Sequence, residues 1–414
     1  MNKEVFVNNR RKILEKLQDN TVLVLFSGEA PKKSADEAYT YTPNRNFYYM
    51  SGIDEKNIIM VLGKVRGSVE EKLFINRIDP VMERWVGKTI RPEEAKESSG
   101  ISKIAFTDEF YGFMHALLNS EKVDTVYLDL ERDQWESEET KAEKLVSDLK
   151  RKYPYIAVKN AYNIIAELRM IKSPEEIEQI REAISITWEG IQNAMRNVKP
   201  GTYEYVAEAY FDFALKVRGV KDFAFKTIAA SGKNAAVLHY SSNDSIIGQA
   251  DMLLMDLGAQ WNYYNADITR TFPASGKFTE RQKQIYDIVL KAQMEVIKTI
   301  KPGVPFKNLN AVTRKLYVDE LSKLGLVSND EELSKYYFHG VSHHLGLDTH
   351  DVGSRDMELE PGMVLTVEPG LYIEEEGIGI RIEDDVLVTE DGCQVLSDYI
   401  IKTTDEIEQF MNQK

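Results

Sequence analysis

Four carboxylates lie in short segments that are otherwise apolar enough to form buried strands. They are Asp256 in "LLMDLG", Asp267 in "ADITRTF", Glu368 in "VLTVEPG" and Glu383 in "GIRIEDDV". Successive side chains of a strand point to opposite faces, so Asp267 shares a face with Thr269 and Thr271. Buried carboxylates are costly unless they are paired, hydrogen-bonded or metal-bound, and four together raise one another's pKa. Divalent cations are the simplest way to hold four such acids ionised in one pocket.

The histidines favour the same interpretation. The chain has six, at positions His115, His239, His339, His343, His344 and His350. Imidazole together with carboxylates suits Mn, Fe, Co or Zn, whereas carboxylates and water alone suit Mg or Ca better. One histidine and four carboxylates suffice for two ions if two of the carboxylates bridge them. This is the two-metal hydrolytic arrangement, in which ions about 3.5–4 Å apart activate one water.

Each of these residues, taken singly, has a competing interpretation. A lone acid in a strand is more often exposed or at a cap than bound to a metal. Asp256 and Glu368 lie next to turn residues, and "DDV" (384–386) fits a solvated strand end. His343 and His344 point opposite ways in an extended segment, so at most one of them is a ligand. The whole set, in order and on matching faces, favours the metal site.

The second part of the chain repeats its own pattern. Residues 189–219 and 291–325 each predict a helix, a "KPG" stop, a second helix and a glycine. A histidine and two acids follow each stretch, namely His239, Asp256 and Asp267 in the first half and His350, Glu368 and Glu383 in the second. This order predicts two related halves that face each other, with a site at their shared axis.

Length and pattern predict two domains in the α/β (α+β) class. Strand-like runs at 21–28, 57–63, 71–77 and 125–130 alternate with helical patterns at 92–99 and 141–153. This alternation predicts an α/β domain with a mixed or parallel sheet over residues 1–172. Ser173 as N-cap, Pro174 at the first helical position and Glu176 in a capping box then begin a long helix. We therefore place the second domain at residues 173–414.

The composition excludes several classes of function. The 414-residue chain has a net charge of -15, so it lacks the excess of Lys and Arg that binding to nucleic acid or an anionic membrane requires. Cys393 is the only cysteine, which argues against a disulfide-stabilised secreted protein. The N-terminal residues predict an amphipathic helix without the apolar core of a signal peptide, and no apolar run has membrane-spanning length. We expect a cytoplasmic protein.

The blocks that hold these residues resemble the pita-bread metallopeptidases, and most closely the aminopeptidase P (Xaa-Pro aminopeptidase) family. The C-terminal blocks are "DLG" (256–258), "ADITRTF" (266–272), "HGVSHHLGLDTHDVG" (339–353), "LEPGMVLTVEPGLYI" (359–373) and "GIGIRIEDDV" (377–386). The N-terminal blocks are "SADEAYTYTPNRNFYYMSGID" (34–54) and "ERWVG" (83–87). The resemblance implies a creatinase-like N-terminal domain over 1–172, which assembles oligomers and caps the site, and a catalytic pita-bread domain over 173–414.

The resemblance also implies roles for single residues. Asp256 would hold one ion, Asp267 and Glu383 would bridge two ions, and His343 and Glu368 would complete the other. The implied metal is Mn, with Co or Zn as alternatives. His239 and His350 match histidines near the scissile peptide, and Arg381 matches an arginine within the site. Asp36 and Trp85 match residues that contact substrate across subunits in oligomeric relatives, so they are candidate substrate contacts only.

The implied reaction is hydrolysis of the bond between an N-terminal residue and a following proline. A metal-bridging water attacks the carbonyl, and Glu368 accepts its proton. One of His239 and His350 stabilises the oxyanion, and the other donates to the leaving nitrogen. The implied partners are peptides with proline in second position and further copies of the chain in a homodimer or homotetramer. The alternatives are an Xaa-Pro dipeptidase (prolidase) with the same ligands and a non-catalytic peptide-binding module.

Overall fold

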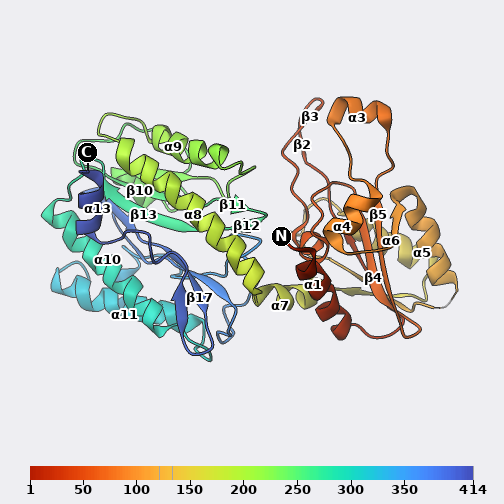
Figure 1. The fold of residues 1–414 in the computed structure, drawn as a ribbon. Helices are drawn as coiled ribbons and strands as arrows, with labels where there is room; N and C mark the ends of the chain where they lie inside the picture. The colour runs from red at the N-terminus through yellow and green to blue at the C-terminus, as the bar shows by residue number, and fades with distance from the viewer. Residues whose placement is uncertain (121, 133, 414) are drawn as a thin grey trace. The chain divides into compact units, whose positions relative to one another are not determined.

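The computed structural model describes residues 1–120, 122–132 and 134–413. The chain divides into two compact units, Met1–Arg169 and Met170–Lys414 (Figure 1). The predicted domain boundary, between residues 172 and 173, lies just beyond this division. We describe each unit separately.

Unit 1 is built on a six-stranded mixed sheet with the order β6-β5-β4-β1-β7-β8. Its strands are β1 (Thr21–Phe26), β4 (Ile59–Val65), β5 (Ser68–Ile75), β6 (Ile104–Phe106), β7 (Thr125–Leu128) and β8 (Ala157–Asn160). Strand β1 pairs antiparallel with β4 and parallel with β7, so the predicted mixed sheet is confirmed. A short hairpin, β2 (Lys32–Ser34) and β3 (Glu37–Ala38), lies outside this sheet.

Helices cover the sheet of unit 1 and bury its apolar side chains. They are α1 (Lys3–Lys16), α2 (Arg45–Ser51), α3 (Pro80–Val86), α4 (Pro92–Ser99), α5 (Phe110–Asn119), α6 (Lys141–Lys152) and α7 (Tyr162–Met170). Phe110 of α5 and Leu145 of α6 pack with Val24 and Phe74 of the sheet in one core cluster. Helix α3 differs because it has no buried residue, and Trp85 on it is 82% exposed.

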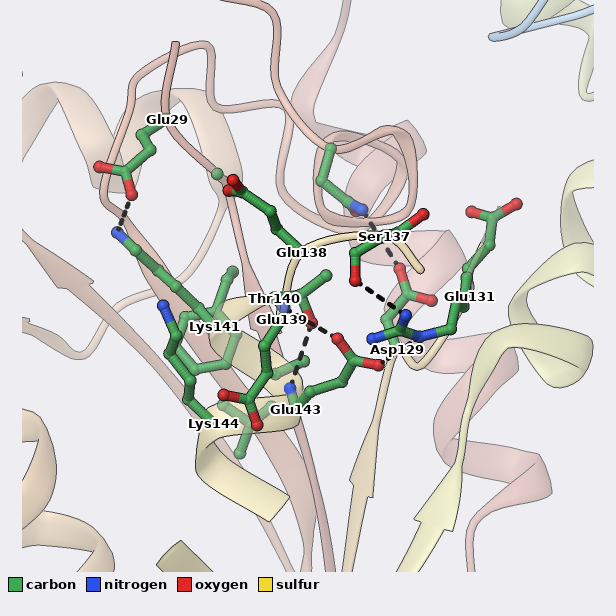
Figure 2. Close-up of a pocket in the computed structure, with 16 residues that line it drawn as sticks. Glu29, Asp129, Glu131, Ser137, Glu138, Glu139, Thr140, Lys141, Glu143 and Lys144 are labelled. Atoms are coloured by element: carbon green, nitrogen blue, oxygen red, sulfur yellow. Dashed lines mark hydrogen bonds and ion pairs between the residues drawn. The ribbon is translucent and has the colours of Figure 1, made fainter. Parts of the chain in front are cut away.

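A cavity of about 480 Å³ lies in unit 1 beside the start of α6 (Figure 2). Two ion pairs form among its charged side chains. Arg132 Nε lies 2.9 Å from Glu143 Oε1, and Lys141 Nζ lies 3.5 Å from Glu29 Oε1. Thr140 caps α6 in a capping box with Glu143. The cavity is therefore a polar hollow in which acidic side chains outnumber basic ones, six to three.

Unit 2 contains two pairs of long helices, and within each pair the helices pack together (Figure 1). The helices are α8 (Pro174–Asn197), α9 (Glu204–Val217), α10 (Glu280–Thr299), α11 (Lys307–Lys323), α12 (Asp330–Leu333) and α13 (Thr404–Met411). Ser173 caps α8 in a capping box with Glu176, and the helix ends before the "KPG" turn, as predicted. Among the helices in the described part of the chain, none combines the length and apolarity that crossing a membrane requires.

The strands of unit 2 form small antiparallel sheets in each half. They are β9 (Ile228–Ser231), β10 (Met252–Leu257), β11 (Gln260–Trp261), β12 (Tyr264–Asn265), β13 (Ile268–Pro273), β14 (Val364–Val367), β15 (Gly370–Ile373), β16 (Ile378–Arg381), β17 (Asp384–Val388) and β18 (Cys393–Val395). The first half has the order β13-β10-β9, and the second half has β14-β17-β18 with the separate pair β15-β16. The fold class is the predicted one.

Glycines mark the same points in both halves of unit 2. Gly201 and Gly303 of the two "KPG" turns have φ of 91° and 79°, and Gly219 and Gly325 after the second helices have φ of 72° and 70°. Left-handed backbone is costly for residues with a Cβ, which explains glycine at each turn. The two halves thus repeat one order of helix, turn, helix and strands.

Candidate metal centre and substrate cavity

The four predicted acidic ligands lie at the ends of strands in unit 2. Asp256 is near the end of β10, and Asp267 immediately precedes β13. Glu368 follows β14, and Glu383 immediately precedes β17. The backbone N–H of Glu383 donates to the carbonyl oxygen of Thr269, at 3.1 Å, and so joins the two halves. Strand ends from both halves therefore meet at one place.

Three of the predicted ligands form a tight cluster. Asp267, His343 and Glu383 each offer a ligand atom, and these atoms lie within 4.8 Å of one another. His343 Nε2 lies 3.4 Å from Asp267 Oδ2 and 3.7 Å from Glu368 Oε1. Its Nδ1 lies 3.0 Å from the carbonyl oxygen of His344, which can only accept. A neutral His343 ring therefore carries its proton on Nδ1 and turns the Nε2 lone pair to the carboxylates.

The electrostatics of this cluster fit divalent cations. Burial raises the pKa of Asp267 well above its ordinary range, and the charges of Asp256 and Glu368 raise it further. Burial and Asp267 raise the pKa of Glu383 in the same way. Asp256 Oδ1 is buried, and within the described ranges it has no hydrogen-bond partner. Acids that repel one another and an oxygen without a donor are the arrangement that a bound cation relieves.

The threonines of β13 explain the alternation seen in the sequence. Thr269 Oγ1 donates to Glu383 Oε2 at 2.6 Å, so it orients a predicted bridging carboxylate. Thr271 Oγ1 donates to the carbonyl oxygen of Arg381 at 3.0 Å and ties β16 to β13. Asp267 shares their face of the strand. The polar face of β13 is thus a hydrogen-bonding surface that positions side chains of the opposite half.

Arg381 lies at the centre of a second hydrogen-bonded chain. It is buried, and its Nη2 donates to Asp256 Oδ2 at 2.5 Å while Nη1 donates to Tyr372 Oη at 2.9 Å. His339 Nδ1 lies 2.7 Å from the carbonyl oxygen of Gly340, so His339 Nε2 accepts the Tyr372 hydroxyl at 2.9 Å. Burial lowers the pKa of His339 to about 4, which keeps it neutral. This chain of hydrogen bonds, from His339 through Tyr372 and Arg381, fixes the orientation of the Asp256 carboxylate.

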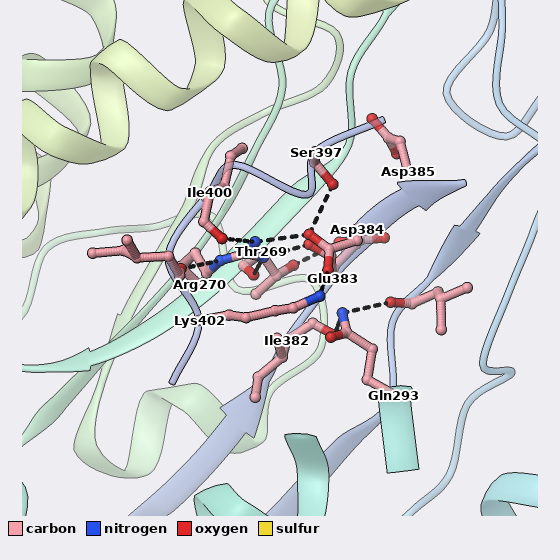
Figure 3. Close-up of polar contacts among 12 residues, drawn as sticks. Thr269, Arg270, Gln293, Ile382, Glu383, Asp384, Asp385, Ser397, Ile400 and Lys402 are labelled. Atoms are coloured by element: carbon pink, nitrogen blue, oxygen red, sulfur yellow. Dashed lines mark hydrogen bonds and ion pairs between the residues drawn. The ribbon is translucent and has the colours of Figure 1, made fainter. Parts of the chain in front are cut away.

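A second network of hydrogen bonds and ion pairs surrounds Asp384, away from the metal cluster, and is made by Arg270, Ser397 and Lys402 (Figure 3). Arg270 is fully buried and donates to Asp384 Oδ1 at 2.7 Å and to the carbonyl oxygen of Glu383 at 2.5 Å. Lys402 Nζ lies 2.5 Å from Asp384 Oδ2, and Ser397 donates to Oδ1 at 2.8 Å. Burial alone would raise the pKa of Asp384, but Arg270 and Lys402 outweigh burial and lower it. "DDV" is therefore not a solvated strand end, because both acids are buried: Asp384 is paired with Arg270 and Lys402, and Asp385 Oδ2 accepts the backbone N–H of Asp267 at 3.2 Å.

Two further contacts hold the ends of the ligand-bearing strands. The buried Gln293 of α10 donates to the carbonyl oxygens of Val367 and Ile382, at 3.3 and 3.1 Å (Figure 3). These two residues immediately precede Glu368 and Glu383. One amide from a helix therefore fixes the backbone next to two predicted ligands.

The cluster opens into a cavity of about 630 Å³. Its wall contains the five predicted ligands and the other predicted site residues of unit 2, namely Asp256, Asp267, His343, Glu368, Glu383, His239, His350 and Arg381. The ring of His350 packs edge-on against that of His343, with centroids 4.3 Å apart. Burial, His343 and His239 lower the pKa of His350 to about 4, so it is neutral at pH 7.

Three residues discussed from the sequence lie elsewhere. His344 is buried, stacks on Phe306 with ring centroids 5.2 Å apart, and is not part of the cavity wall described above. Asp36, between β2 and β3, and Trp85, on α3, are exposed residues of unit 1. Their contact with substrate stays a prediction.

Sequence reasoning missed two side chains that this geometry makes important. His339 and Tyr372 complete the chain that ends on Asp256, and His339 also lines the cavity. Both lie inside the quoted blocks, in "HGVSHH" and "EPGLYI". Strand alternation places Tyr372 in an apolar segment, so nothing in the local pattern indicates that its hydroxyl meets an arginine.

Comparisons with known proteins agree with this site. Residues 178–390 match the metallopeptidase family M24, and residues 6–127 match the N-terminal domain of aminopeptidase P. The Xaa-Pro aminopeptidase of Escherichia coli is 33% identical over 99% of this chain and 98% of its own. The human Xaa-Pro aminopeptidase 3 is 34% identical over 95% of this chain and 81% of its own.

Solved structures lead to the same family. A Bacillus anthracis structure described as an aminopeptidase P is 53% identical, with a TM-score of 0.98 over 99% of this chain and 98% of that chain. E. coli aminopeptidase P with the inhibitor Pro-Leu is 34% identical, with a TM-score of 0.92 over the same shares. Full-length relatives with this name decide against the dipeptidase and the binding module. The chain belongs to the aminopeptidase P family of M24 metallopeptidases, and its activity is that of an Xaa-Pro aminopeptidase, a metal-dependent exopeptidase.

Proposed function

We propose that the chain removes the N-terminal residue from peptides with proline in second position, using two divalent ions held by Asp256, Asp267, His343, Glu368 and Glu383. The observation that carries this proposal is the convergence of all five side chains on one cavity, the four acids from strand ends and His343 from the segment before β14. Asp267 and Glu383, which lie together at the junction of the two halves, would be the ligands shared by both ions. The expected ion is Mn²⁺, with Co²⁺ or Zn²⁺ as alternatives.

When bound, such ions supply an acidified water as nucleophile and Lewis acidity toward the scissile carbonyl. Glu368 is the proton acceptor, because its carboxylate faces the cavity with a side chain 19% exposed. Burial raises its pKa above the ordinary range, toward the value that suits a general base. Arg381 holds Asp256 in place through the 2.5 Å contact.

His239 and His350 act on the peptide itself. One donates a hydrogen bond to the developing oxyanion, and the other donates to the proline nitrogen as it leaves. A neutral imidazole has one N–H to donate, which is the form that the lowered pKa of His350 favours. The acidic end of the cavity holds the free α-amine of the substrate, which accounts for exopeptidase behaviour.

Relatives support the substrate class. One solved structure holds E. coli aminopeptidase P with the inhibitor Pro-Leu, and another holds the Zn-substituted enzyme with product. Proline at the second position removes the peptide N–H from the scissile bond, so the site needs no acceptor for it. We infer that this chain takes short peptides with the same feature. We also propose a cytoplasmic location.

Unit 1 has the proposed role of assembling a homodimer or homotetramer and capping the site. Support comes from the exposed apolar side chains of α3, where Val81 is 63% and Trp85 is 82% exposed. Asp36 and Trp85 are then substrate contacts. Sedimentation of wild type and a Trp85→Ala variant tests this role, because a change in mass together with a higher KM is expected. An unchanged mass and KM would remove Trp85 from it.

The decisive experiment is hydrolysis of Xaa-Pro and Xaa-Pro-Yaa peptides by metal-stripped protein, with and without added Mn²⁺. Release of the first residue from the longer peptide, only with the ion, is the expected result. Isothermal titration with Mn²⁺ should give two ions per chain. A chain that binds one ion or none at full activity would exclude the two-metal assignment.

A further inference from the structure

Glu204 is a buried acid outside the substrate cavity for which the reaction gives no role. It lies in the first turn of α9, and its exposed fraction is 0%. Lys and Arg are absent from the partners that the structure gives its carboxylate. Hydrogen-bond donors surround it instead, and these donors all come from residues 231–245. A carboxylate that is fully buried among neutral donors is held there by those hydrogen bonds.

The contacts of Glu204 are divided between its two oxygens. Oε1 accepts from the backbone N–H of Ser231 at 2.7 Å, from its hydroxyl at 2.7 Å and from Asn234 Nδ2 at 3.0 Å. Oε2 accepts from the hydroxyl of Tyr240 at 2.7 Å and from the backbone N–H of Ser245 at 3.0 Å. Oε1 is thus fixed to the end of β9 and the turn after it, and Oε2 to the loop that follows.

That loop, residues 237–245, carries His239 into the substrate cavity; we call it the His239 loop. Leu238, His239 and Ser241 line the cavity, whereas the Tyr240 side chain turns back to Glu204. The two neighbours therefore point in different directions, one to the peptide and one to the buried acid. The position of the His239 backbone depends on where the Tyr240 hydroxyl is held.

A second acid of α9 fixes the far end of the same loop. Glu208, one helical turn after Glu204, accepts from Asn243 Nδ2 at 2.9 Å. Asn243 is buried, and its amide also donates to the carbonyl oxygen of Thr227 and accepts from the N–H of Ala229. The His239 loop is therefore attached to α9 and β9 at both ends, and only the stretch around His239 is exposed to the cavity.

We propose that Glu204 is a positioning residue of the peptidase, which holds His239 at the peptide by fixing Tyr240 and Ser245. The inference rests on the role proposed above for His239. Glutamine has nearly the same shape but presents an amide N–H₂ where one carboxylate oxygen was. In a Glu204→Gln variant this donor faces Ser231 N–H or Ser245 N–H, which cannot turn away, so the loop must shift. Displacements near 1 Å cost activity by about 10²-fold in positioned sites.

The test is a double-mutant cycle with His239→Ala, measured with an Xaa-Pro-Yaa peptide and Mn²⁺. Glu204→Gln should lower kcat/KM by roughly 10- to 100-fold. The loss should fall in whichever of kcat and KM the His239→Ala change affects. The double variant should be no worse than His239→Ala alone, within about twofold, because both changes remove one interaction. Mn²⁺ stoichiometry by calorimetry should stay unchanged. Glu176→Gln is the matched control, because Glu176 is a buried acid in the first turn of α8 that accepts from Ser173 and Tyr264.

Tyr240→Phe provides the same test with a smaller change to the core, since it removes one hydroxyl only. It should lower kcat/KM less than Glu204→Gln does. This loss should also be absent when His239 has already been replaced by Ala. If the losses in kcat/KM multiply in the double variants, Glu204 has a purely structural role and the proposal is overturned. The proposed role of His239 would then be unaffected. Wild-type activity of His239→Ala would instead remove the proposed role of His239, and the positioning role of Glu204 with it.

Discussion

Glu383 and Asp384 are neighbours in sequence, yet their carboxylates lie in opposite environments. Glu383 faces the cavity among other acids, and its pKa is raised well above the ordinary range by burial and by Asp267. Asp384 lies behind the strands between Arg270 and Lys402, and its pKa is lowered. Burial is nearly complete for both. The comparison shows that burial alone does not set the pKa of these two acids, because the cations beside Asp384 reverse its effect.

The largest expected effect comes from removing the cavity-facing acid. Glu383→Ala should abolish hydrolysis of Xaa-Pro-Yaa peptides and lose both ions together, because one carboxylate bridges them. Metal analysis of the dialysed protein and a peptide-release assay measure the two effects. Glu390→Ala removes an exposed acid from the same half and should change neither. Retention of one tightly bound ion by the Glu383 variant would show that this carboxylate does not bridge.

Breaking the network around Asp384 should instead reduce the free energy of unfolding. Arg270→Met removes a cation from the fully buried Asp384, and breaking a buried pair costs about 3–5 kcal/mol. Urea unfolding of the metal-free protein measures this change. Arg281→Met breaks the partly exposed Arg281–Glu376 pair, at 2.6 Å, and should cost less than about 1 kcal/mol. Equal losses from both variants would contradict the distinction between the two environments.

A smaller effect separates the metal ligands from the residues that act on the peptide. His350→Ala should lower kcat by about 10²-fold or more, as expected for loss of a hydrogen-bond donor to the developing oxyanion, and leave metal content unchanged. His115→Ala is the control, since His115 is exposed on α5 of unit 1. Loss of metal in the His350 variant would mean that the ring packed against His343 supports that ligand instead.

The smallest expected effect is a difference between two pH values in how far Mn²⁺ raises the Tm. Asp267 and Glu383 have raised pKa values, so in the metal-free protein their contribution to stability is complete below about pH 4 and is lost as pH rises. Asp384, with a lowered pKa, contributes fully above about pH 4 and loses its contribution only as pH falls further. The gain in Tm on adding Mn²⁺ should therefore be larger at pH 8 than at pH 5.5, where protons compete with the ion. Calorimetric scans at both values measure it, and an equal gain would exclude the carboxylates as the site.

Much of this architecture follows from local sequence patterns. The capping box at Ser173 gave the start of α8, and the "KPG" turns gave the ends of the helices in both halves. Period-two alternation placed Asp267, Thr269 and Thr271 on one face of β13. These features depend on neighbours in sequence, so a single chain reveals them.

Other features depend on segments that meet only in the fold. The interpretation of "DDV" as a solvated strand end was wrong because Arg270, more than a hundred residues earlier, neutralises Asp384. The chain from His339 through Tyr372 to Asp256 joins three segments for the same reason. Tertiary pairing, unlike alternation, leaves no periodic trace in the sequence.

The meeting of the two halves at Glu383 N–H and Thr269 has a consequence for synthesis. The chain is made from its N-terminus, so Asp256 and Asp267 of the first half are made before His343, Glu368 and Glu383 of the second. A nascent chain that holds only Asp256 and Asp267 has two carboxylates and no partner half. Stable binding of both proposed ions therefore requires that the second half is made and docked on the first, so acquisition of the ions reports that docking of the halves is complete.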